Sequence, residues 1–181
     1  MKTTVQGRAG FLAGLVALWA GCGIGTISEE ELEADYRVMP DKPLDQFVGG
    51  MVAELKDELG TTDIQIKELT VLSNYAVVEA AYPGHHNRIY SFRYDGFWLS
   101  ELDLKDDEPD KSTLFAAKDI PIAELSALHQ KAHDTLGHDP GSFCQLTIRQ
   151  NDAGQMDISI SIRKNIKSCD SVVFDAAGQK R

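Results

Sequence analysis

Residues 156–164, MDISISIRK, carry the pattern that decides the fold. Apolar and polar side chains alternate along this stretch, which is typical of a β-strand with one buried and one solvated face. Ile158, Ile160 and Ile162 are expected to face the core. The outward set is Asp157, Ser159, Ser161 and Arg163. The stretch therefore predicts one strand of a half-solvated sheet.

The residues around this strand complete a helix followed by a meander. Strands are expected at 143–150 and 171–174, and the turn NDAGQ at 151–155 joins the first of them to residues 156–164. Upstream, residues 120–136 place apolar side chains at helical spacing, and Gly137 ends that helix. This half of the chain predicts one helix and three antiparallel strands.

The first half of the chain shows the same order. Residues 43–59 have apolar side chains at three- and four-residue spacing, and Gly60 ends the predicted helix. Asp95-Gly96 is the two-residue signal of a tight hairpin. The predicted strands are 64–72, 76–82, 88–94 and 97–104.

Short matches align the two halves at one offset. KDELG, which ends at Gly60, lies 77 positions before HDTLG, which ends at Gly137. ELT at 68–70 lies 77 positions before QLT at 145–147. A fixed offset between two units of the same order indicates an internal duplication.

These patterns predict an α+β fold made of two duplicated units. The units span 43–104 and 120–181, and the polar segment 105–119 links them. Each unit is a helix plus an antiparallel meander. We expect the two meanders to form one continuous sheet with both helices on one face.

The start of the chain is typical of an export leader. Residues 1–8 carry Lys2 and Arg8 and no acid, and residues 9–20 are apolar. A positive end, a short apolar run and a small-residue exit describe a signal peptide, here 1–21. The run is too short for a membrane span, which needs about 20 apolar residues.

LWAGC at 18–22 resembles the lipobox of bacterial lipoproteins, although Trp19 stands where that family prefers leucine. The resemblance implies that Cys22 is acylated, by chains such as palmitate, and becomes the first residue of the mature chain. Gly23 is not an aspartate, which by the family's export rule implies the periplasmic side of the outer membrane rather than the inner membrane. Ordinary secretory cleavage is the alternative.

An acidic tether is expected to follow at 22–42, with an acidic cluster at 29–33. As a flexible coil it would span about 25 Å, although a short helix at 28–36 is an alternative. The whole chain has 18 basic and 28 acidic residues, and both basic residues of the leader are lost on cleavage. The mature chain is therefore strongly acidic, which excludes a nucleic-acid partner, restricts membrane contact to the lipid and fits a basic protein partner.

Cys144 and Cys169 form an even pair once Cys22 carries lipid, and an oxidising compartment favours their disulfide. Simple geometry opposes this bond. The two cysteines fall on the first and third strands of a meander, about two strand spacings apart. The bond therefore requires the turn before Cys169 to fold back, or the two strands to be neighbours.

A helix followed by antiparallel strands, twice, resembles the tandem units of PepSY domains and β-lactamase-inhibitor-like proteins. The residues that carry this resemblance are the two Leu-Gly helix ends, the meanders and VVFDAAGQKR at 172–181. The resemblance implies an open sheet face that binds or inhibits another protein. It implies no catalytic residues.

His129 and His133 invite a metalloprotease interpretation, because histidines four apart share a helix face. That chemistry needs a glutamate after the first histidine, and Gln130 stands there. His138 falls at the wrong spacing for a third ligand. We expect His129 to edge the core, with adventitious metal binding as the alternative, and His85-His86 to lie in a solvated hairpin loop.

Tyr90, Phe92 and Tyr94 alternate along one strand, and Phe97 and Trp98 follow its turn. If this strand face meets the helices, it is core. If it is the open face, it becomes a binding surface for a protein. The sequence alone leaves both open.

The sequence therefore predicts an envelope-anchored lipoprotein with no catalytic residues, metal or cofactor, which binds or modulates another envelope protein. The expected contacts are the outward set on residues 156–164. The alternative is a carrier of a small lipid-like ligand, which needs a sizeable apolar pocket between helices and sheet.

Overall fold

The computed structural model describes residues 42–84, 88–105, 113–138, 143–165 and 168–181. The leader, Cys22, nearly all of the tether and His85-His86 lie outside these residues. The fold is mixed α+β, as expected, and the described residues form two α-helices and one eight-stranded antiparallel sheet. The helices are α2 (Leu44–Leu59) and α3 (Leu125–Leu136). The strands are β1 (Gln65–Val71), β2 (Ala76–Ala81), β3 (Ile89–Tyr94), β4 (Leu99–Lys105), β5 (Phe115–Ala116), β6 (Phe143–Gln150), β7 (Met156–Asn165) and β8 (Ser168–Asp175).

The sheet is continuous across the two halves of the chain. Its order is β4-β3-β2-β1-β6-β7-β8, and β5 pairs with the first residues of β1. The halves meet where β1 pairs with β6, with Thr70 directly opposite Thr147. The prediction of one continuous sheet is confirmed.

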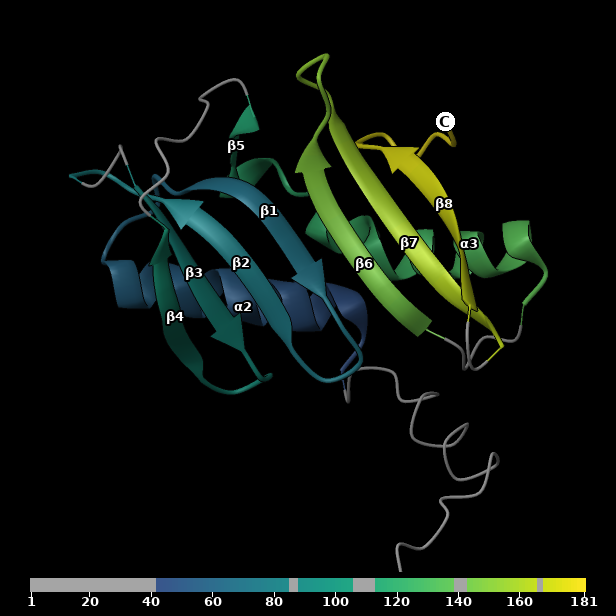
Figure 1. Cartoon of the computed structure of the whole chain (residues 1–181), viewed down its shortest axis with the longest axis horizontal. Coiled ribbons are helices and arrows are strands. Elements are labelled where there is room, and N and C mark those ends of the chain that lie inside the picture. The colour runs from purple at the N-terminus through teal and green to yellow at the C-terminus, as the bar shows by residue number, and fades with distance from the viewer. Residues whose placement is uncertain (1–41, 85–87, 106–112, 139–142, 166–167) are drawn as a thin grey trace, which may run out of the picture.

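The core lies between the sheet and the two helices, which run behind the sheet in Figure 1. Ile158, Ile160 and Ile162 of β7 are fully buried, as their alternation predicted, and the residues between them are only half-buried. Helix α3 contacts β7 and β8, and α2 contacts α3 and β4. One apolar cluster therefore joins both halves of the chain.

The aromatic row on β3 belongs to this core. Tyr90, Phe92 and Tyr94 are buried, and the ring of Phe47 on α2 meets that of Tyr94 edge-on, with 5.2 Å between centroids. Of the two alternatives that the sequence left open, the structure selects the core.

Helix α3 begins later than expected. Its apolar spacing predicted a helix from 120, but Ile120 is extended (ψ 124°), and a 3₁₀ turn (Ile122–Glu124) precedes α3. The reason is Pro121, since the residue before a proline is forced out of the helical region. Both helices end as predicted, at Gly60 and Gly137 in the left-handed conformation.

The segment 105–119 contains structure that the sequence pattern does not reveal. Phe115 of the two-residue strand β5 and Ala117 of a 3₁₀ turn (Ala117–Asp119) are buried, and the Ala117 N–H donates to the carbonyl of Ile64 at 2.9 Å. Two residues inside a polar run are too few to show a strand period.

Cys144 and Cys169 are bonded, and the disulfide prediction is confirmed. The bond passes over β7, since β6 and β8 are not neighbours. The pairing register shifts beside Cys144 in the β6–β7 ladder and beyond Arg163 in the β7–β8 ladder. Such irregularities bend strands, and here the two Cα atoms lie 6.7 Å apart, within the range that a disulfide spans.

Candidate functional site

The candidate site is the open face, which we define as the side of β1, β6, β7 and β8 turned away from α2 and α3. This side faces the viewer in Figure 1. Its side chains alternate with the buried ones along each strand and are mostly polar. They include all four residues of the predicted outward set.

The middle of the open face is hollowed. The hollow encloses about 260 Å³. It is lined by Glu68, Gln145, Thr147, Arg149, Asp157, Ser159 and Val173. Of the predicted contacts, Asp157 and Ser159 line the hollow, whereas Ser161 and Arg163 lie further along β7.

The predicted contacts did not include the lining residues outside β7. The signal was present for β6, where Gln145, Thr147 and Arg149 alternate with the buried Leu146 and Ile148. No such signal reveals that β1 lies beside β6. The structure shows that pairing, with Thr70 opposite Thr147, and no local sequence pattern indicates it.

Charges of both signs meet in the hollow. Arg149 is exposed and lies directly opposite Glu68 on β1 and Asp157 on β7. Asp157 also accepts an ion pair from Arg181 at 2.8 Å and a hydrogen bond from the Asn151 amide at 3.1 Å. Although the chain is acidic, this part of its surface is close to electrically balanced.

The hydroxyl and amide groups of the open face hold one another. The Gln145 amide donates to the Thr147 hydroxyl at 2.7 Å, and the Thr70 hydroxyl donates to Glu68 at 3.2 Å. Ser161 and Ser171 share a hydrogen bond of 2.7 Å. Fixed side chains lose little freedom on binding, so the face is ordered before a partner arrives.

This arrangement offers hydrogen bonds and ion pairs from two carboxylates, a guanidinium, an amide and hydroxyls. The lining of the hollow contains hydroxyls but no histidine or cysteine. It is also polar and lies on the opposite side of the sheet from the apolar core, so it does not match the apolar pocket that a lipid carrier needs.

The histidines of α3 lie on the other side of the sheet, in the core. His129 and His133 are buried, and their Nε2 atoms are 3.0 Å apart. His133 Nδ1 faces the carbonyl of His138 at 3.3 Å, so it carries the hydrogen and leaves Nε2 to accept from His129. Burial, and then the proximity of His133, lower the pKa of His129 to about 4.

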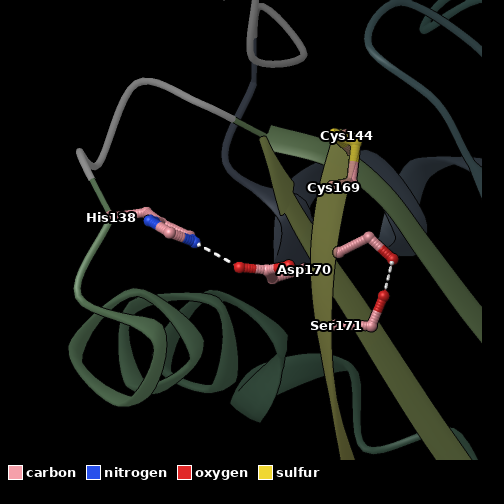
Figure 2. The surroundings of a disulfide bond; sticks show 6 residues. His138, Cys144, Cys169, Asp170 and Ser171 are labelled. Atoms are coloured by element: carbon pink, nitrogen blue, oxygen red, sulfur yellow. Dashed lines mark hydrogen bonds and ion pairs between the residues drawn. A yellow bond between two sulfur atoms is a disulfide. The ribbon is translucent and has the colours of Figure 1, made fainter. Parts of the chain in front are cut away.

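The prediction that His129 edges the core is therefore confirmed, and His133 joins it there. His138 instead bonds Asp170 on β8 at 3.0 Å. Figure 2 shows these two residues on one side of β8 and Ser171 on the other. Among the described residues, no three His, Cys, Asp or Glu side chains are grouped to hold a metal ion.

Comparisons with known proteins identify no relative by sequence. No family model matches the chain, and no curated protein matches it. A solved structure, a candidate lipoprotein from Clostridium difficile 630, is similar over 85% of this chain and 97% of its own, with 17% identity and a TM-score of 0.47. A similarity of this size identifies neither the family nor the function.

Proposed function

We propose that this protein is an envelope lipoprotein, anchored through Cys22, that binds another envelope protein on the open face without chemically changing it. The observation that carries the binding role is the hollow, a polar and electrically balanced surface fixed by its own hydrogen bonds. Such a surface recognises a partner through matched donors, acceptors and charges.

The anchor rests on the leader of the sequence. The basic start, the apolar run and the small residues before Cys22 form the lipobox-like signal described above. No helix among the described residues is long and apolar enough to cross a membrane. The outer membrane, on its periplasmic side, is the location that Gly23 favours.

We also propose that the two halves arose by duplication. Three features recur at the offset of 77: the left-handed glycine at the helix end, the register shift near the start of the first strand, and the buried triplet of that strand. Thr70 and Thr147, equivalent by this offset, lie opposite each other where the halves pair. A residue facing its own equivalent is what a local twofold axis between two copies requires. Among the described residues of the second half, no strand corresponds to β4.

Photo-crosslinking in the native envelope tests the binding role. A photoreactive amino acid at Ser159, in the hollow, is expected to give one adduct of defined mass. The same amino acid at Glu58, exposed on α2, is expected to give no such adduct. Arg149→Ala in the Ser159 background should reduce the adduct on the order of tenfold, because it removes the one positive charge among the described residues that line the hollow.

The outcomes separate binding at the hollow from chance encounters. Equal adducts from Ser159 and Glu58 would contradict the proposal, and so would a Ser159 adduct that Arg149→Ala leaves unchanged. Arg149 is exposed on β6, so its replacement by alanine leaves the core intact.

A further inference from the structure

Two large aromatic side chains project from one rigid turn. The aromatic tip, residues 95–98, joins β3 to β4. Phe97 is 68% exposed and Trp98 is 76% exposed. The other strongly exposed large apolar side chain among the described residues is Leu102, on the adjoining edge strand β4. Exposed aromatic pairs of this kind mark interaction sites.

The turn beneath these side chains is tightly fixed. Asp95 Oδ1 accepts the N–H groups of Phe97 at 3.0 Å and Trp98 at 2.8 Å, and these bonds lower the pKa of the Asp95 carboxyl. Gly96 adopts φ 100°, which favours glycine, and its carbonyl accepts the Tyr94 hydroxyl at 2.8 Å. The two rings are therefore displayed by a built turn and not by a loose loop.

The tip lies where the amino-terminal segment joins the fold. The ammonium of Lys42, the first described residue, donates to the Gly96 carbonyl at 2.8 Å and lies 4.5 Å from the centroid of the Phe97 ring. Only the 19 residues 23–41 separate it from Cys22. A flexible coil of this length spans about 25 Å.

An anchored chain would therefore keep the tip near the membrane on average. A short linker raises the effective concentration of the second contact to roughly the millimolar range. A weak contact between the tip and the membrane is then sufficient to hold the tip there. Tryptophan and phenylalanine suit this place, because aromatic rings favour the boundary between headgroups and acyl chains.

We propose that Phe97 and Trp98 insert into the interface of the same bilayer that holds the acyl chains of Cys22, giving the domain a second membrane contact and a fixed orientation. This inference rests on the proposed anchor. Insertion of the tip would leave the β6–β7 turn, at the opposite end of the sheet in Figure 1, pointing away from the membrane. The inference departs from the sequence expectation that the lipid is the only membrane contact, and because the mature chain is acidic it applies to zwitterionic lipid rather than to an anionic surface.

The chain carries a natural probe for this contact. It has two tryptophans, Trp19 and Trp98, and removal of the leader leaves Trp98 alone. The acylated protein, purified from membranes, is reconstituted into vesicles of phosphatidylethanolamine and phosphatidylcholine that contain brominated phosphatidylcholine. We expect a blue-shifted emission that bromines near the headgroup quench at least twofold.

The control moves the tryptophan. In a Trp98→Phe, Ala153→Trp chain the probe sits on the exposed β6–β7 turn, and its emission should be neither shifted nor quenched. If the protein floats with vesicles and Trp98 is quenched no more than this control, the inference is overturned while the anchor stands. A purified chain without acyl groups would overturn the anchor, and the inference with it.

Discussion

Replacing both Cys144 and Cys169 by serine is expected to lower the free energy of unfolding by about 3.5 kcal/mol. The bond closes a loop with a sequence separation of 25, and a loop of this length restricts the unfolded chain by roughly that amount. Cys169 is exposed and Cys144 is half-buried, so serine leaves no sizeable cavity that would add to the loss. Urea unfolding, followed by circular dichroism, measures the change.

Reductant provides the matched control for this prediction. All chains carry Cys22→Ser, so that no third thiol can exchange. Reductant should destabilise the chain with both cysteines by the same amount and leave the double-serine chain unaffected. If reductant left the urea midpoint of the chain with both cysteines unchanged, this would contradict a stabilising bond between β6 and β8.

Acid is expected to lower the free energy of unfolding through His129. Protonation of carboxylates alone does not explain the loss over this range of pH. The folded pKa is about 4, against an ordinary value of 6.5. As the pH falls below 6.5, the unfolded chain takes up the proton first, since the folded chain holds His129 neutral. His129 therefore contributes about 3 kcal/mol to the free energy of unfolding above pH 6.5. This contribution is lost as the pH falls from 6.5 to about 4.

His129→Gln isolates this contribution, because glutamine does not titrate yet can still donate to His133 Nε2. Unfolding free energies measured from pH 7 to 4 should fall more steeply for the natural chain than for the variant. Carboxylates contribute to both chains and cancel in the difference. Identical slopes for the natural chain and His129→Gln would contradict the account.

Local patterns predicted most of the secondary structure. The alternation of residues 156–164 and the glycines at 60 and 137 each act within a few residues, so they can be read without knowing what lies beside them. The late start of α3 is a case of two local signals in conflict. The steric effect of Pro121 overrides the apolar spacing.

Contacts between distant segments were harder to predict. The disulfide conflicted with ideal strand spacing, and only the bends in the ladders around β7 bring the two sulfurs together. The hollow depends on β1 lying beside β6, and the orientation of Phe97 and Trp98 depends on the turn that Asp95 fixes. Cysteine count and compartment predicted the disulfide, but composition and spacing contain neither the pairing of β1 with β6 nor the orientation of these two rings.

The anchor at Cys22 is the claim on which both the proposed location and the membrane contact depend. The intact mass of the protein, extracted from the membranes of its own host, tests it most directly. We predict a chain that begins at Cys22 and carries the added mass of acyl groups, which tandem fragmentation places on that residue. An unacylated chain, or one that begins at another residue, would contradict the account.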